Sequence, residues 1–379
     1  MCIFEHGLRF FEFLFIAPKG AESRIRLRRG TMTTYTVYKE QLPGLFEKWS
    51  KLYALHVPAR LREGFYDLVP WKKDLEIAWD YDVAYNSAKR FVMPPHEALI
   101  TYDRRTCEAK PVFDAPKQIL FGVHPYDVKA LNQLDQIMEA GSPDQNYIRR
   151  REATVVMVFE PLTVSSSAFW ASVGASSVAH GFDLYWTKIG PAAFTVEVGS
   201  VRGEELLGMN GPLLASTAGD KEGARRAKAR VLAKARKNAL RYNWEETPRL
   251  LAKCWDSPLW RRYSQMCLAC GSCNLVCPTC YCFDIREESD DQLETGVRSR
   301  EWDGCMLEGF AKVAGNHNFR PKAQDRYRHR YFRKGKYIYD KIGELGCVGC
   351  GRCVRACTAG IANPLKVFNE LWEETAHEY

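Results

Sequence analysis

The chain reads CLACGSCNLVC over residues 267–277 and CVGCGRCVRAC over residues 347–357. Both stretches have the spacing C-x2-C-x2-C-x3-C, so eight of the 14 cysteines fall into two copies of one pattern. Three closely spaced thiols can surround one corner of a compact metal centre, while the fourth lies about one turn later and points away. A glycine follows the second cysteine of each copy, Gly271 and Gly351, where a tightly folded chain benefits from the absence of Cβ. The two stretches therefore predict a pair of neighbouring metal-binding loops.

This spacing is that of the iron–sulfur loops of two-cluster ferredoxins, in which the fourth cysteine binds the other cluster. The expected ligands are Cys267, Cys270, Cys273 and Cys357 for cluster 1, and Cys347, Cys350, Cys353 and Cys277 for cluster 2. Structural zinc is an alternative, but zinc sites usually pair a C-x2-C with a second, distant pair. Disulfides are the other alternative, and a chain without a convincing export signal is expected in a reducing compartment. We therefore expect two [4Fe–4S] clusters as cofactors and a cytoplasmic location.

Composition limits the other functions of the chain. Its 379 residues, 46% of them hydrophobic, suffice for two domains with their own cores. The net charge is +8, and basic residues are concentrated at 221–241 among alanines and leucines. This composition favours a helix, either with a solvated basic face or with a docking surface for an acidic partner subunit. No nucleic-acid-binding motif accompanies it, so we expect no nucleic-acid partner.

The first 31 residues do not have the pattern of a folded element. The apolar run from Phe10 to Ala17 contains Glu12 and is too short to span a bilayer. It also lacks the small-residue cleavage site of a secretory signal. We expect residues 1–31 to be an unstructured extension, and we expect no membrane span.

The hydrophobic pattern divides the rest of the chain into three parts. Residues 32–215 alternate β-rich runs, at 98–101, 118–123, 153–159, 182–189 and 193–198, with helical patterns around 42–55 and after Pro125. Residues 216–262 form a basic helical connector, and residues 263–379 hold both cysteine motifs, with a long insert at 283–346 between them. The predicted fold class is α+β: a mixed N-terminal assembly domain, the connector, and a mainly helical, ferredoxin-like dicluster domain. Without a G-x-G-x-x-G or P-loop motif, the chain is expected to bind no nucleotide itself.

Five segments together resemble a known family. They are FGVHPYDVKALNQLD (121–135), GFDLYWTKIG (181–190), CLACGSCNLVCPTCYCFD (267–284), WDGCMLEGFAKVAGNHNFRP (302–321) and CVGCGRCVRAC (347–357). Over about residues 32–370 the chain is similar to the beta, iron–sulfur subunits of sulfhydrogenases, the NAD(P)H-linked nickel–iron hydrogenases, and to the related A subunits of anaerobic sulfite reductases. The resemblance implies two partners, a flavin-containing NAD(P)H-binding subunit and a terminal redox subunit. The terminal subunit is a nickel–iron hydrogenase in sulfhydrogenases and a sirohaem subunit in the sulfite reductases.

The chain departs from this family in its N-terminal domain. Relatives commonly carry further cysteines there, where this chain has Tyr126, Phe159, Ala168 and Trp170. A cluster needs thiolate donors, and Cys107 is the one cysteine of this domain after Met32. The resemblance therefore implies that an N-terminal cluster of relatives is absent here and that the domain serves packing and assembly.

Other residues near the motifs have two interpretations each. Cys280 and Cys282 follow the first motif and are expected to be structural, small buried residues, although a third site with Cys305 and Cys254 is an open alternative. Four arginines of the insert are candidates for raising a cluster's reduction potential, because a cation stabilises the reduced, more negative state. They are Arg320, Arg326, Arg328 and Arg330, and a solvated basic face is their alternative role.

The sequence thus predicts a non-catalytic electron-transfer subunit that connects a flavoprotein to a terminal partner such as a nickel–iron hydrogenase. The alternative is a subunit of a sulfite or heterodisulfide-type reductase acting on a sulfur compound, and a structural assembly factor is a third possibility. Substrate binding at a cluster would require an open iron, and the complete set of eight cysteines argues against it. No Ser/His/Asp, Cys/His or paired-carboxylate constellation indicates catalysis by the chain itself.

Overall fold

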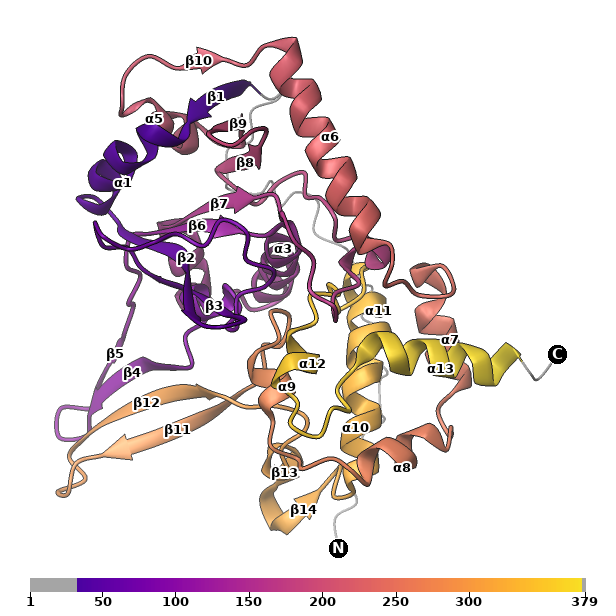
Figure 1. The fold of residues 1–379 in the computed structure, drawn as a ribbon. Helices are drawn as coiled ribbons and strands as arrows, with labels where there is room; N and C mark the ends of the chain where they lie inside the picture. The colour runs from indigo at the N-terminus through magenta and orange to yellow at the C-terminus, as the bar shows by residue number, and fades with distance from the viewer. Residues whose placement is uncertain (1–32, 377–379) are drawn as a thin grey trace, which may run out of the picture.

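A computed structural model describes residues 33–376, and the extension expected at residues 1–31 lies outside the described residues. The fold is α+β, as predicted: a layered N-terminal region, a β-sheet arm, and a helical region that contains both cysteine motifs (Figure 1). No helix of residues 33–376 is long and apolar enough to cross a membrane.

A mixed sheet of eight strands forms the centre of the N-terminal region, in the order β10-β1-β9-β8-β7-β6-β2-β3 within the described chain. Strands β2, β6, β7 and β8 pair in parallel, and the outer strands pair antiparallel. Every residue of β6 and β7 is buried, as is typical of parallel strands that are covered on both faces. The bounds are β1 (Thr34–Tyr38), β2 (Ala54–Arg62), β3 (Phe65–Pro70), β6 (Gln118–Val123), β7 (Thr154–Phe159), β8 (Leu184–Lys188), β9 (Ala193–Val198) and β10 (Leu214–Ala215).

Helices cover both faces of this sheet. The side chains of Ile119 and Phe121 share one core with α1 (Leu42–Ser50) and α5 (Val201–Gly208). Leu120 faces the opposite side, where it packs with α3 (Pro125–Glu139) and α4 (Gln145–Ala153). Successive residues of a strand point to opposite faces, so one short apolar strand supplies both cores.

The expected secondary structure is confirmed in most of this region, with one error of extent. The runs at 118–123 and 193–198 are strands with those bounds, and a helix follows Pro125. The helical pattern around 42–55, however, ends at Ser50, and Ala54 begins β2. In β2 the side chains of Leu55 and Val57 both enter the core of the sheet, and this strand pairing overrides the helical periodicity.

A second, four-stranded sheet projects from the body as an arm (Figure 1). This β arm contains β4 (His96–Asp103), β5 (Glu108–Pro111), β11 (Phe283–Ser289) and β12 (Thr295–Trp302), in the order β11-β12-β4-β5. Its first two strands come from the N-terminal region and its last two from the insert between the cysteine motifs. At its base, the buried Glu97 forms ion pairs with Arg150 and Arg300, which tie the arm to α4.

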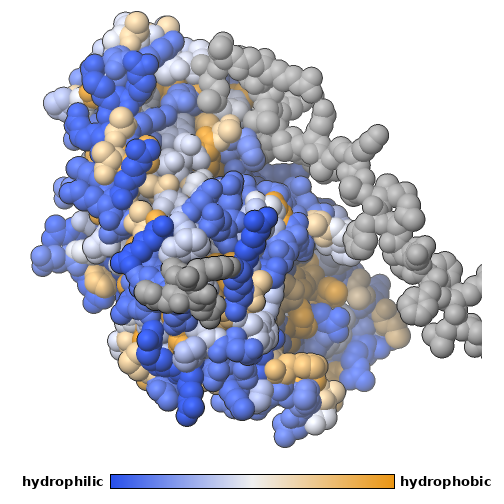
Figure 2. Space-filling view, turned by 90° about the vertical axis from the view of Figure 1, so that its right-hand side faces the viewer, coloured by the Kyte–Doolittle hydropathy of each residue, from blue (hydrophilic) through white to orange (hydrophobic). Residues whose placement is uncertain are grey.

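The C-terminal region is helical. The connector contributes α6 (Ala218–Ala235), α7 (Thr247–Lys253) and α8 (Leu259–Ser264), and the motifs contain α9 (Ser272–Leu275) and α12 (Arg352–Ala356). The insert contributes α10 (Ala323–Phe332), the π-helical turn η6 (Arg333–Tyr337) and α11 (Ile338–Ile342). The last helix of the described chain is α13 (Pro364–Ala376). Short elements are η1 (Lys39–Gln41), α2 (Lys89–Val92), η2 (Trp170–Val173), η3 (Trp244–Glu246), η4 (Gly309–Ala311), η5 (Ala314–Asn316), β13 (Lys312–Val313) and β14 (His317–Asn318). Figure 2 shows the side of the molecule towards α13 as mainly hydrophilic, with small apolar patches.

The basic stretch at 221–241 is helical up to Ala235, as its composition predicted. The helix α6 begins with a capping box between Thr217 and Asp220. Arg225 and Arg226 are exposed and form ion pairs with Glu222 on the same helix face. These contacts agree with a solvated helical face and leave the docking alternative open.

Candidate metal centres

Two neighbouring cavities contain the eight cysteines of the two motifs, four around each. The first is lined by Cys267, Cys270, Cys273 and Cys357. The second is lined by Cys277, Cys347, Cys350 and Cys353. Each cavity thus has three cysteines of one motif and the fourth cysteine of the other. We call them site 1 and site 2.

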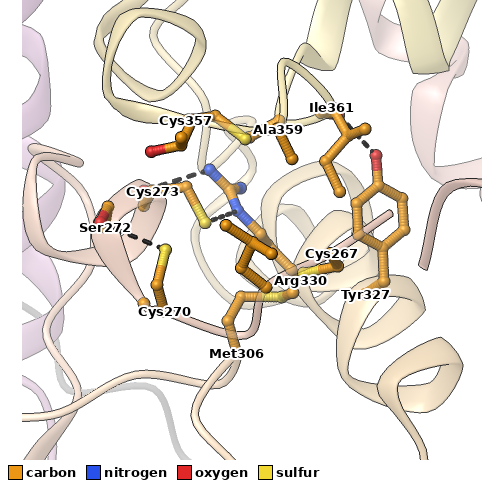
Figure 3. A pocket seen from close by; sticks show the side chains of 14 residues that line it. Cys267, Cys270, Ser272, Cys273, Met306, Tyr327, Arg330, Cys357, Ala359 and Ile361 are labelled. Atoms are coloured by element: carbon orange, nitrogen blue, oxygen red, sulfur yellow. Dashed lines mark hydrogen bonds between the residues drawn. The ribbon is translucent and has the colours of Figure 1, made fainter. Parts of the chain in front are cut away.

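Site 1 lies between the loop before α9 and the helix α10, and Figure 3 shows its side chains. Besides the cysteines, Met306, Tyr327 and Ile361 line it, and the Tyr327 hydroxyl donates to the Ile361 carbonyl at 2.7 Å. One wall is open to solvent, because the side chain of Cys270 is exposed and Leu268 is 66% exposed. Site 1 is therefore the more accessible of the two.

Site 2 lies deeper, beneath the N-terminal region. Phe169, from the loop before η2, lines the cavity together with the cysteines and Val348. The Phe169 amide donates to the Gly349 carbonyl at 2.8 Å, so this loop is fixed directly onto the cysteine loop. Cys350 and Cys353 are both buried.

Glycines allow the two cysteine loops to turn this tightly. Gly271 and Gly351 have φ values of +72° and +81° and immediately precede the short helices α9 and α12. A Cβ on Gly349 would lie 2.6 Å from the Trp170 amide nitrogen, and one on Gly351 would lie 2.8 Å from the Ser167 carbonyl. Other residues rarely adopt this left-handed conformation, and here they would also collide with the loop that covers site 2.

Two buried cations face the sulfurs. Arg330, in α10, is 2% exposed and lines both cavities; its Nε donates to Cys273 Sγ at 3.2 Å and its Nη2 to the Cys273 carbonyl at 3.2 Å (Figure 3). Lys334, in the π-helical turn η6, lines only site 2, and its Nζ donates to Thr279 Oγ1 at 2.6 Å. Burial alone would lower the pKa of Lys334, but the nearby Cys277 and Cys280 sulfurs outweigh burial and raise it. Among residues 33–376, neither cation has a carboxylate ion-pair partner.

The donors and the charges of both sites fit [4Fe–4S] clusters. Burial raises the pKa of the Cys350 and Cys353 thiols, so by themselves these groups would stay protonated. Bound iron deprotonates a coordinating thiol, and four thiolates around an iron–sulfur core carry a net negative charge. That charge would compensate Arg330 and Lys334, whose burial without an anion would otherwise be costly.

A buried ion pair attaches the second cysteine loop to the N-terminal region. Arg352, between Cys350 and Cys353 in sequence, donates from Nη1 and Nη2 to the two carboxylate oxygens of Asp127 at 2.6 and 2.7 Å. Its Nε donates to the Ala84 carbonyl at 2.7 Å. The side chains of the ion pair are 2% and 4% exposed. Asp127 lies in the first turn of α3, where the helix dipole also favours a carboxylate.

Apolar side chains occupy the four positions at which the family resemblance implies cysteines in relatives. Tyr126, Ala168 and Trp170 are buried together in the core that also contains Cys350, and the rings of Tyr126 and Trp170 stack at 6.3 Å. Phe159 belongs to the core of the sheet instead. Three of the four positions therefore meet next to site 2.

Four other cysteines of the C-terminal half line neither cavity: Cys254, Cys280, Cys282 and Cys305. Asn274 Nδ2 contacts the sulfurs of Cys280, at 3.6 Å, and Cys305, at 3.4 Å. Cys282 is half-buried, and its carbonyl accepts a hydrogen bond from the Asp303 amide at 3.1 Å. The Cys254 sulfur donates to the Leu371 carbonyl at 3.9 Å. Cys280 and Cys305 are thus held by an amide side chain, and a third metal site stays an open alternative.

Of the four candidate arginines in the insert, Arg330 is the one that lines the cavities. Arg326 is buried, but its Nη1 donates to the carbonyls of Arg320 and Pro321. The guanidinium of Arg328 lies over the Trp255 ring and forms an ion pair with Asp325. The candidate role of these other arginines in raising a cluster potential therefore has no support in these contacts.

Lys334 and the Asp127–Arg352 ion pair were not predicted from the sequence. Lys334 follows Arg330 by four residues, which indicates a shared helix face, but six other lysines and arginines at 320–336 conceal that signal. The position of Arg352 inside the second cysteine motif could have suggested that this arginine needs a buried partner. That partner, Asp127, lies 225 residues away in the chain, so the sequence did not identify it.

Comparisons with known proteins agree with these features. Residues 266–361, which include both motifs, match the 4Fe-4S dicluster domain family. The chain is 31% identical over 339 residues to sulfhydrogenase 2 subunit beta of Pyrococcus furiosus. That match covers 89% of this chain and 98% of the relative.

Proposed function

The chain belongs to the family of sulfhydrogenase beta subunits, and on that premise we propose that it relays electrons through two [4Fe–4S] clusters between two partner subunits. The coarser function, an iron–sulfur electron-transfer subunit, follows from the family and from the dicluster domain. The observation that carries the finer proposal is the grouping of the thiols, four around each of two adjacent cavities.

We assign the ligands in the crossed arrangement. Cluster 1 is held in site 1 by Cys267, Cys270, Cys273 and Cys357, and cluster 2 in site 2 by Cys277, Cys347, Cys350 and Cys353. Each cluster, when bound, accepts and returns one electron, so the pair connects a two-electron flavin donor to one-electron steps. With four thiolates for each cluster, no iron is left open for a substrate.

The chain itself determines where electrons can enter and how the sites communicate. Arg330 lines both cavities, so its side chain lies at the boundary between site 1 and site 2. Met306 and Ile361, which are 2% and 4% exposed, close the inner side of site 1 with apolar surface. Exposed Cys270 and Leu268 form the outer side. We therefore place electron exchange with one partner at site 1.

The partners follow from the family. We propose a flavin-containing NAD(P)H-binding subunit as donor or acceptor at one end, and a terminal redox subunit at the other. A nickel–iron hydrogenase is the favoured terminal subunit, because the matched relative is named a sulfhydrogenase subunit. Cysteines that bind metal as thiolates are typical of a reducing compartment, which supports the cytoplasm as the location of this chain with its 14 cysteines.

Iron analysis tests the number of clusters. Protein reconstituted without oxygen should hold eight irons and eight sulfides per chain, because each cluster contains four of each. Twelve of each would show a third cluster, and Cys280, Cys282 and Cys305 would then be the first candidates as ligands.

Paired serine variants test the crossed ligands. In EPR spectra of the reduced protein, Cys277→Ser should change the same signal as Cys350→Ser, and Cys357→Ser the same signal as Cys270→Ser. Cys254→Ser, a buried cysteine that lines neither cavity, is the control. If Cys277→Ser alters the signal that Cys270→Ser alters, the crossed assignment is wrong.

A coupled assay tests the relay itself. The purified subunit should not oxidise NAD(P)H, and its clusters should become reduced when the flavoprotein subunit and NAD(P)H are both present. NAD(P)H oxidation by the subunit alone would contradict the proposed function.

A further inference from the structure

The charges around the two sites are distributed unequally, although the sites have the same number of thiols. Arg330 lies at the boundary and lines both cavities, whereas Lys334 lines only site 2. Both side chains are buried, at 2% and 3% exposure, and neither has a carboxylate partner within residues 33–376. Site 1 is therefore lined by one buried cation and site 2 by two.

Two other buried cations near site 2, Lys89 and Arg352, line neither cavity. Lys89 donates from Nζ to the Cys280 carbonyl at 2.9 Å and lies over the Trp302 ring. Arg352 is equally buried, but both oxygens of Asp127 accept hydrogen bonds from it, at 2.6 and 2.7 Å. Its charge is therefore balanced whether or not a cluster is present. Arg330 and Lys334 differ from both because they line the cavities, and the groups they meet are a sulfur, a carbonyl and a hydroxyl, at Cys273 and Thr279.

Local structure holds these two side chains at the cavities. They are four residues apart, at the end of α10 and in the π-helical turn η6, and both point to the same side. Gly335 allows the turn to approach α7 closely, because a Cβ there would lie 2.5 Å from Leu251 Cδ1. A π-helical turn is rare and often occurs at a functional site.

We infer that Arg330 and Lys334 are the built-in counter-charges of the clusters: Arg330 raises the reduction potential of both, and Lys334 raises that of cluster 2 only. The sign follows from electrostatics, because reduction adds a negative charge that a nearby cation stabilises, most effectively where water is excluded. Lys334 therefore raises the reduction potential of cluster 2 relative to that of cluster 1, and cluster 2 is easier to reduce than it would be without this lysine. This inference rests on the proposed function, since it requires both clusters.

EPR-monitored redox titration of the reconstituted full-length protein tests the inference. Arg330→Gln should shift both midpoint potentials to more negative values, and Lys334→Gln should shift that of cluster 2 alone. Arg330→Lys and Lys334→Arg keep the charge and should restore most of each shift. Arg326→Gln is the matched control, a buried arginine one turn earlier in α10 that donates to backbone carbonyls and lines neither cavity.

The outcomes separate this inference from the proposed function. If the unaltered protein holds fewer than eight irons, the proposed function fails. If it holds eight irons but both glutamine variants have unchanged potentials, the inference alone fails. Equal shifts of both signals in Lys334→Gln would also overturn it, because the asymmetry would be absent. If Arg330→Gln takes up no clusters, Lys334→Gln and Arg330→Lys still decide the result.

Discussion

Replacing Asp127 with Asn should destabilise the attachment of the second cysteine loop and site 2 with it. The carboxylate accepts two hydrogen bonds from Arg352, which lies between two cysteines of that site. In the Asn variant one oxygen becomes an NH2 group, so a donor would face a guanidinium donor. The guanidinium would then stay buried, with its charge uncompensated and one of its hydrogen bonds lost.

The size of the effect follows from the burial of the pair. Removing one partner of a buried ion pair costs about 3–5 kcal/mol, because the remaining charge stays in a medium of low polarity. That loss is a large part of the total stability of a typical domain, about 5–15 kcal/mol. With an entropy of unfolding of about 2.1 cal/mol/K per residue, a cooperative chain of this length should have a Tm lower by about 4–6 °C.

Thermal unfolding under anaerobic conditions, followed by circular dichroism and by EPR, measures both consequences. Besides the lower Tm, the signal of cluster 2 should disappear at a lower temperature than that of cluster 1. Arg355→Gln is the control, because its ion pair with Asp82 is in the same loop but both side chains are about one quarter exposed. Ion pairs that solvent reaches in this way contribute at most about 1 kcal/mol. An Asp127→Asn variant with a Tm as high as that of Arg355→Gln would show that the buried ion pair does not stabilise this attachment.

Two further substitutions have clear expected outcomes. Gly349→Ala places a Cβ 2.6 Å from the Trp170 amide nitrogen at a φ of +65°. The EPR signal of cluster 2 in this variant should therefore be lost on warming before that of cluster 1. Gly343→Ala is the control for backbone strain alone, because Gly343 has a φ of +74° and a Cβ there would have no neighbour within 4 Å. Burial raises the pKa of Glu160 from 4.5 to about 7, so the folded protein binds this proton more tightly than the unfolded chain and its stability falls as pH rises between those values. Glu160→Gln should remove about 3 kcal/mol of that loss of stability. The Tm of this variant should therefore exceed that of the unaltered protein by more at pH 8 than at pH 5. An equal difference in Tm at both pH values would contradict this.

The grouping of the thiols is the feature that the sequence predicted best. The fourth cysteine of each motif follows a short helix, α9 or α12, and this fixed offset carries Cys277 and Cys357 away from their own loops. The cavities group the thiols in the crossed sets that the spacing requires, and cluster binding by these sets stays a prediction. Local spacing was sufficient here because the chain between the cysteines has little conformational choice.

Features that depend on distant contacts were not predicted. The strand β11 is almost entirely exposed, so it has no alternation of buried and exposed residues that would indicate a half-buried strand. Lys334 is in a stretch whose composition is typical of a solvated surface, and the sulfurs that raise its pKa come from two other segments. The helix expected to extend to residue 55 ends early because β2 is held by a sheet whose other strands lie far along the chain. In each case tertiary contacts, rather than local propensity, determine the outcome.

The composition of the β arm also constrains how this protein is made in the cell. Strand β4 is complete at Asp103, but its central partner β12 begins at Thr295. At a translation rate of about 5–20 residues per second, synthesis of the chain between β4 and β12 takes about 10–40 s, and β4 lacks this partner for that time. During this interval its unpaired edge is open to aggregation or to a chaperone. The sheet of the arm can therefore form only after the first cysteine motif has been synthesised. A fragment that begins at residue 263 would contain β11 and β12 but lack β4, with which β12 pairs.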